Sequence, residues 1–115
     1  MNKTEFAFWD CDETLILHDT KKYKKLKKIK IKDPFNTKYI HTVAIHEKHI
    51  KWLKIFAARG TRNVVWSAGG QEWARAIVEA LGLKNEVYIC IAKPSGALYD
   101  DDPKVFYAVP RWEKP

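Results

Sequence analysis

The sequence predicts an α/β domain in which a three-layer, Rossmann-like arrangement surrounds a mostly parallel sheet. Short apolar runs alternate with stretches of helical periodicity, as in strands that are joined by crossover helices. Each apolar run is followed by a polar residue, which is typical of buried strands whose ends reach solvent. A chain of 115 residues has room for one domain of this kind, so we expect residues 1–115 to fold as a single unit.

The first predicted strand is the apolar run Phe-Ala-Phe-Trp at residues 6–9, which ends at Asp10. A β-hairpin flap is expected after it, as an insertion over about residues 20–44. Alternating Lys and Ile at residues 28–32 indicate one strand of this flap, and Asp-Pro-Phe-Asn at residues 33–36 is typical of a turn.

A first helix is predicted where apolar residues recur at helical spacing between Ile45 and Phe56, and Gly60 fits the end of this helix. Residues 63–66 then predict a second buried strand that ends at Ser67. The Ala-Gly-Gly turn after that strand leads into a second helix, whose core face includes Trp73.

A third strand is predicted at residues 87–91 and ends near Lys93. A very short fourth strand is predicted at residues 97–99 and ends at Asp100. In parallel sheets of this type, ligands bind at the carboxyl ends of the strands. The four strand ends therefore predict a site in which Asp10, Ser67, Lys93 and Asp100 converge.

Phosphoryl transfer is the chemistry that these side chains could perform together. It needs a nucleophile, a proton donor for the leaving oxygen, a divalent cation and donors for the phosphate oxygens. Asp10 and Asp12 could supply the nucleophile and the proton shuttle. Mg²⁺ prefers oxygen ligands, so Asp10 with Asp100 or Asp101 could hold it.

The phosphate itself is expected to bind near Ser67, which precedes a glycine-rich turn and a helix N-terminus. Lys93 would add a positive charge that neutralises the negative charge between nucleophile and phosphate. Each of these residues also has an ordinary structural interpretation. Ser67 could be a helix cap, Lys93 an exposed loop lysine, and the Asp100-Asp101-Asp102 run a turn before Pro103.

The order of these motifs resembles that of the haloacid dehalogenase superfamily. Residues 8–15, Phe-Trp-Asp-Cys-Asp-Glu-Thr-Leu, resemble its first motif, which is fairly specific. Residues 64–67, Val-Val-Trp-Ser, resemble the second motif, Lys93 the third and residues 99–101, Tyr-Asp-Asp, the fourth. The resemblance covers roughly residues 6–103, and it is to the short members without a large cap domain, including small phage-encoded ones.

The resemblance implies a magnesium-dependent phosphatase. Asp10 would form an aspartyl-phosphate, and Asp12 would act first as general acid and then as general base. Mg²⁺ would be held by Asp10, by the backbone carbonyl of Asp12 and by an Asp of the fourth motif. Asp100 is favoured for this last position and Asp101 is second, because three consecutive Asp residues leave the choice open.

The formal net charge is +7, and much of the excess lies in one block of eight lysines within twelve residues. The block comprises Lys21, Lys22, Lys24, Lys25, Lys27, Lys28, Lys30 and Lys32. Such a block is typical of a solvated face, and it can also attract polyanions. It lies in the predicted flap, so nucleic acid bound through the stretch from Lys21 to Lys38 is one expectation for the phosphorylated substrate.

Other features limit the remaining classes. No apolar run approaches the ~18 residues that span a bilayer, so a cytoplasmic protein without membrane contact is expected. Cys11 and Cys90 form no Cys-x-x-Cys pair, which favours two buried thiols. The four histidines do not form a convincing set of metal ligands.

Two alternatives to a phosphatase remain open. A receiver-like phosphoacceptor domain also combines acidic residues, a hydroxyl and a lysine, but its acidic pair precedes the phosphorylated Asp, and here the order of motifs is different. A non-catalytic polyanion-binding module built on the lysine block is the second alternative. Every residue of the four motifs is present, which disfavours the second alternative.

Overall fold

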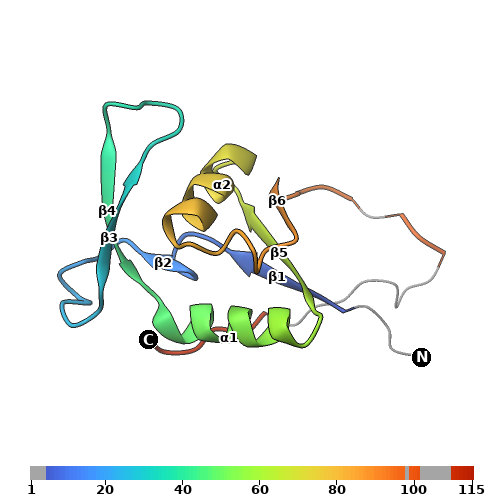
Figure 1. Ribbon diagram of the computed structural model, residues 1–115. Coiled ribbons are helices and arrows are strands. Elements are labelled where there is room, and N and C mark those ends of the chain that lie inside the picture. The colour runs from blue at the N-terminus through green and yellow to red at the C-terminus, as the bar shows by residue number, and fades with distance from the viewer. Residues whose placement is uncertain (1–4, 98, 102–109) are drawn as a thin grey trace.

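The computed structural model describes residues 5–97, 99–101 and 110–115 and shows a mixed α/β fold with two sheets and two helices (Figure 1). β1, β5 and β6 form a parallel sheet in the order β1-β5-β6, and β2, β4 and β3 form an antiparallel sheet in the order β2-β4-β3. The elements are β1 (Phe6–Asp10), β2 (Ile16–Leu17), β3 (Lys28–Lys32), β4 (Ile40–Ile45), α1 (Glu47–Ala58), β5 (Arg62–Ser67), α2 (Gln71–Ala80) and β6 (Ile89–Ala92).

The register of the parallel sheet brings the ends of its strands to one edge. Asp10, the last residue of β1, pairs with Trp66, and the next residue of β5, Ser67, pairs with Ala92 at the end of β6. The predicted strands at residues 6–10 and 63–67 are therefore confirmed, together with their parallel pairing.

The main core lies where both helices meet the face of the parallel sheet that carries Val65. Leu53 of α1 and Ile77 of α2 are fully buried in the same cluster as Val65. Trp9 of β1 pairs with Val65 of β5, and its ring packs on Phe56 of α1 with 5.8 Å between centroids. Among the described residues, this packing gives one helical layer against one sheet, and it does not establish the third layer that the sequence predicts.

Asn63 is a buried polar residue that ties three elements together. Its Nδ2 donates to the carbonyl oxygens of Leu53 at 3.0 Å and Glu86 at 2.9 Å. Its Oδ1 accepts from the indole N–H of Trp9 at 2.9 Å. Because buried polar groups are costly unless they are paired, these three bonds specify how β5, α1 and β1 fit together.

The expected hairpin is confirmed as β3 and β4, which project from the parallel sheet (Figure 1). Ile31 is buried, whereas the lysines on either side of it are exposed, as the alternating pattern predicts. Asp33 shapes the turn, because its Oδ1 accepts from the amides of Phe35 and Asn36 and its Oδ2 lies 2.9 Å from Nε2 of His41. These bonds, with that of His41 first, lower the pKa of Asp33 below its ordinary value.

The structure also differs from the sequence-based expectation. The strand expected at residues 87–91 is observed as Ile89–Ala92. Ala97, Tyr99 and Asp100 are not in a strand, and Leu98, the middle of the predicted fourth strand, lies outside the described residues. Neither α1 nor α2 is long and apolar enough to span a bilayer, and no other helix occurs in the described part of the chain.

Candidate active site

Asp10, Ser67 and Lys93 meet at the carboxyl edge of the parallel sheet. The backbone N–H of Lys93 donates to the carbonyl oxygen of Ser67 at 2.8 Å, which extends the pairing of β5 and β6 by one residue. The ammonium group of Lys93 lies 3.9 Å from Oδ2 of Asp10. Both side chains are partly exposed, at 44% for Lys93 and 37% for Asp10, so this ion pair is open to a ligand from solvent.

The chain turns sharply after Asp10. The carbonyl oxygen of Cys11 accepts hydrogen bonds from the amides of Thr14, Leu15 and Ile16 at 2.9–3.2 Å. Glu13 has a φ of 62°, in the left-handed region that non-glycine residues seldom adopt. Cys11 is buried, and burial, with smaller contributions from the charges of Asp12 and Asp10, raises the pKa of its thiol far above the ordinary value. The thiol is therefore neutral, and a neutral thiol is a poor nucleophile.

Asp12 is held by two side chains that the sequence did not connect with it. Nε2 of His18 lies 2.7 Å from Oδ1 of Asp12. The indole N–H of Trp73, on α2, lies 3.2 Å from each carboxylate oxygen. Trp73 was expected only in the core, and it is buried, but its polar edge reaches the site. No local signal indicated the contact, because the two residues are 61 positions apart.

Ser67 is fully buried, and its Oγ accepts from the backbone N–H of Gly69 at 3.0 Å. Gly69 has no room for a side chain, because a Cβ there would lie 3.2 Å from the Trp73 ring and 3.3 Å from Ser67 Oγ. Gly70 has a φ of 107° and is the residue directly before α2, so no side chain caps the first amides of this helix. The turn therefore brings the amide end of α2 beside Ser67, as the sequence predicts.

The hairpin reaches over this turn. The ring of His41, on β4, packs on Trp73 with 4.7 Å between centroids. Phe35, in the hairpin turn, places its Cζ 3.9 Å from where a Cβ of Gly70 would lie. The hairpin thus contacts both the residue that holds Asp12 and the glycine turn beside Ser67, which gives the flap a place at the rim of the site.

Oxygen atoms of acidic residues at this edge of the sheet suit a magnesium ion. The Asp10 carboxylate and the main-chain carbonyl of Asp12 would supply oxygen ligands, which suits a cation that proteins often hold through one or two carboxylates, water and substrate phosphate. Asp100 and Asp101 are exposed. Within residues 5–97, 99–101 and 110–115, no three side chains of His, Cys, Asp or Glu form a group that could hold a metal ion. Asp102 lies outside these residues.

The lysine block has two roles, one in the positive surface and one in stabilising the turns before β3. Most of its members are exposed, including Lys24, Lys25 and Lys27 in the turns that precede β3. Lys28 is only half-exposed, and its ammonium group donates to the carbonyl oxygens of Tyr23, Lys24 and Leu26. Lys28 therefore stabilises the turns, and the remaining lysines supply the positive surface.

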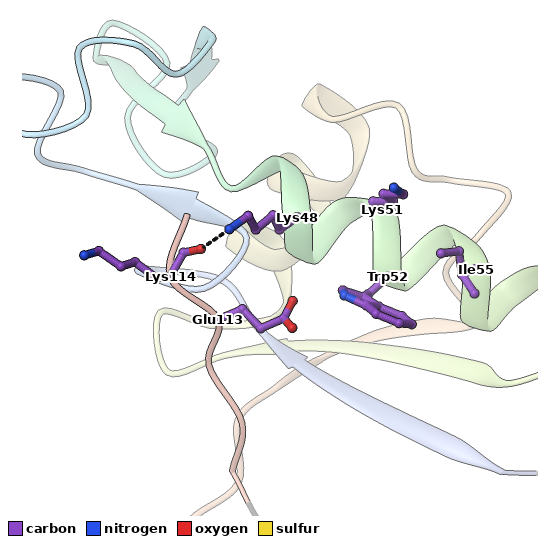
Figure 2. Close-up of a pocket in the computed structure, with 6 residues that line it drawn as sticks. All are labelled: Lys48, Lys51, Trp52, Ile55, Glu113 and Lys114. Atoms are coloured by element: carbon purple, nitrogen blue, oxygen red, sulfur yellow. Dashed lines mark hydrogen bonds between the residues drawn. The ribbon is translucent and has the colours of Figure 1, made fainter.

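A separate cavity of about 590 Å³ lies between α1 and the 110–115 segment, away from Asp10. Figure 2 shows that Trp52 projects from the helix and Glu113 from the segment. Lys48 also joins the two, because its ammonium group donates to the carbonyl oxygen of Lys114 at 2.9 Å. Trp52 is 40% exposed, because the next residue of the helix, Leu53, takes the buried position.

No protein-family model matches the chain, and no curated protein or solved structure matches it at a significant level.

Proposed function

We propose that the protein is a magnesium-dependent phosphatase of the haloacid dehalogenase type, with Asp10 as its nucleophile. The observation that carries this proposal is the meeting of Asp10 and Lys93 beside Ser67 at the carboxyl edge of a parallel sheet, with 3.9 Å between the charged atoms. The motif order along the chain supports it, because the residues that meet there are those of the first three motifs. The complete domain would have the three-layer, Rossmann-like arrangement.

In the proposed reaction, an Asp10 carboxylate oxygen attacks the phosphorus atom of a phosphomonoester and the ester oxygen leaves. Asp12 gives a proton to the leaving oxygen, then accepts one from the water that attacks the aspartyl-phosphate and releases inorganic phosphate. Lys93 and the amide end of α2 stabilise the phosphoryl oxygens, and buried Ser67 holds the glycine turn that precedes these amides through its bond to Gly69.

Magnesium would neutralise negative charge on the phosphoryl group. Its protein ligands would be the Asp10 carboxylate and the Asp12 carbonyl oxygen, with a carboxylate of Asp100 or Asp101 completing the set. The Asp10 side chain is more than one third exposed, so an ion could reach it from solvent.

The substrate we favour is a phosphorylated nucleic-acid end or nucleotide. The exposed lysines of residues 21–38 lie on the flap whose other residues contact the rim of the site. Such a surface raises the local concentration of a polyanion and speeds its association.

Hydrolysis of an aryl phosphate with and without Mg²⁺ tests the proposal. Asp10→Asn, which keeps the shape of the side chain, should lower turnover on the order of 10³-fold or more, and a chelator should abolish it. Acid-quenched enzyme should carry phosphate on Asp10 in the wild type and none in the variant. Full activity in Asp10→Asn would exclude this nucleophile, and activity that a chelator does not change would exclude the metal.

A non-catalytic polyanion-binding module is the second candidate, and the exposed lysines favour it. The same assay separates the two, since a binding module would bind oligonucleotides at low salt but hydrolyse no phosphate ester. A receiver-like domain would become phosphorylated by a small phosphodonor but would not turn it over repeatedly.

A further inference from the structure

Three consecutive carbonyl oxygens in the turn after Asp12 are bound by groups from outside the turn. The Glu13 oxygen accepts from the indole N–H of Trp112 at 2.7 Å. The Thr14 oxygen lies 2.7 Å from Nδ1 of His49, and the Leu15 oxygen accepts from the backbone N–H of His46 at 3.0 Å. The backbone of this turn is thus fixed from two directions, by the start of α1 and by the 110–115 segment.

The 110–115 segment is itself fastened by the same two histidines. Nε2 of His49 accepts from the backbone N–H of Glu113 at 2.9 Å. Nε2 of His46 lies 2.6 Å from the Glu113 carbonyl oxygen. The indole ring of Trp112 packs edge-on against both imidazoles, with centroids 5.6 Å and 6.2 Å away. Glu113 is therefore bound through both its backbone N–H and its backbone C=O.

These partners determine the protonation of both imidazoles. Nε2 of His49 accepts from an amide, so its Nδ1 must carry the proton that is donated to Thr14. Nδ1 of His46 accepts from the backbone N–H of His49 at 3.2 Å, so its Nε2 carries the proton that is donated to Glu113. Both rings are neutral, and a proton added to either one would replace an acceptor by a donor facing an N–H.

The environment of the pair also disfavours a positive charge. The two rings are stacked with 3.5 Å between centroids and 4° between planes, so charging both would bring two cations into contact. The elements that pack around the pair carry charges of both signs: Glu47 and Lys48 at the start of α1, Arg111, Glu113 and Lys114 in the segment, and Asp12 and Glu13 in the turn. Burial, as the largest cause, and the neighbouring His49 lower the pKa of His46, although the bond to Glu113 acts in the opposite direction.

We propose that the 110–115 segment is a strap that holds the turn after Asp12, residues 13–15, in its reactive conformation. The neutral His46–His49 pair is the latch that fastens this strap. Trp112 and His49 are then positioning residues, because they bind the main chain between Asp12 and β2 and do not contact the phosphate. The catalytic part of this inference rests on the proposed phosphatase function, whereas the attachment of the strap does not.

Acid should release the strap. Released His46 binds a proton more readily than latched His46, because the pKa of His46 is lowered in the latched state. Attachment is therefore complete above the ordinary His pKa of about 6.5 and is lost as the pH falls below that value. Loss of the strap should free the Glu13 carbonyl, which Trp112 binds, and loosen the turn.

The indole N–H signals of protein labelled with ¹⁵N at its five tryptophans provide a direct test. Between pH 8 and pH 5, the Trp112 signal should shift in one step and lose its protection from exchange, while that of Trp9, bonded to Asn63, should not. Since Asn is also a good helix cap, His46→Asn should preserve the start of α1, but its shorter side chain should not reach the Glu113 carbonyl oxygen. Its Trp112 signal should therefore be released already at pH 8. His41→Asn, which lies outside the latch, is the matched control and should keep the wild-type profile.

Trp112→Phe tests the effect on the turn, because it keeps an aromatic ring against the histidines but removes the donor to Glu13. Amide exchange of Leu15 and Ile16 should become roughly 5- to 10-fold faster, and kcat for an aryl phosphate should fall roughly 3- to 10-fold with little change in KM. Unchanged exchange in Trp112→Phe, or a Trp112 signal that responds neither to acid nor to His46→Asn, would overturn the strap. A wild type that hydrolyses nothing would count against the phosphatase alone, because the exchange rates are measured without substrate.

Discussion

Oδ1 of Asp12 lies 2.7 Å from Nε2 of His18, and the same oxygen is within 3.2 Å of the Trp73 indole nitrogen. The carboxylate proposed to shuttle the proton is thus oriented by one exposed and one buried partner. His18→Ala should lower kcat for an aryl phosphate by roughly 3- to 10-fold, because Trp73 alone would still hold Asp12 in place. KM should change little.

The measurement is steady-state hydrolysis together with a thermal melt, which should be nearly unchanged because His18 is 41% exposed. Asp12→Asn should be far more damaging than His18→Ala. Equal losses in the two variants would mean that His18 takes part in proton transfer itself, and no loss in His18→Ala would mean that Trp73 is sufficient.

The exposed lysines before β3 should act on the binding of a long substrate and not on the chemical step. Replacing Lys24, Lys25 and Lys27 with Gln should raise KM for an oligonucleotide with a terminal phosphate. It should also reduce the slope of log affinity against log salt by about 2, at ~0.7 per lost phosphate contact on a single strand. Turnover of an aryl phosphate should stay the same.

A control triple variant with the same change in net charge is Lys51→Gln, Lys54→Gln and Lys84→Gln, all at exposed positions outside the flap. If both triple variants weaken the oligonucleotide equally, the effect is one of net charge, and the flap is not a specific surface. Lys28 should be left intact in this experiment, because it stabilises the turns through three carbonyl oxygens.

Gly69 allows Ser67 and Trp73 to approach each other. Gly69→Ala would place a methyl group 3.2 Å from the Trp73 ring and 3.3 Å from Ser67 Oγ, and so displace the indole that holds Asp12. We expect a loss of about 1–3 kcal/mol in unfolding free energy together with lower kcat. Gly60→Ala, which is strained only by its φ of 88°, should lose stability but keep its kcat. Parallel urea melts and aryl phosphate assays measure both effects.

Asn63 should contribute strongly to stability although it lies away from the site. Asn63→Ala would remove the hydrogen-bond partner of the buried Leu53 carbonyl and of the partly buried Glu86 carbonyl and Trp9 indole N–H, at a cost of about 2–4 kcal/mol. Asn36→Ala, in the exposed hairpin turn, is the control and should cost less than 1 kcal/mol. Urea unfolding followed by far-UV circular dichroism would contradict this prediction if the two variants were equally stable.

The local periodicity of the sequence predicted most of the elements. The alternation at residues 28–32 gave the hairpin, and the apolar runs before Asp10 and Ser67 gave the parallel pair, because each pattern is fixed by residues close in the chain. β2 was missed because it has only two residues, Ile16 and Leu17, which are too few to show a period. Its strand character comes from pairing with β4, which the chain reaches much later.

The sequence predicted only those residues of the candidate site that lie at the ends of strands. Asp10, Ser67 and Lys93 follow from the geometry of parallel strands. The contacts of Asp12 with Trp73 and of Glu13 with Trp112 join residues that are 61 and 99 positions apart, and no spacing rule connects them. Only the packing of the folded chain brings these residues together, and the sequence predicted Trp73 solely as a core residue.

The junction between β4 and α1 limits how the hairpin can move. β4 ends at Ile45 and α1 begins at Glu47, so one fully buried residue, His46, joins them. A lid needs a few residues whose backbone can rotate freely, and His46 is bonded on its backbone and on both ring nitrogens. The hairpin should therefore behave as a fixed wall. The size of the entrance to Asp10 would then be the same before and after a substrate arrives, and substrates would be selected by whether they fit that opening.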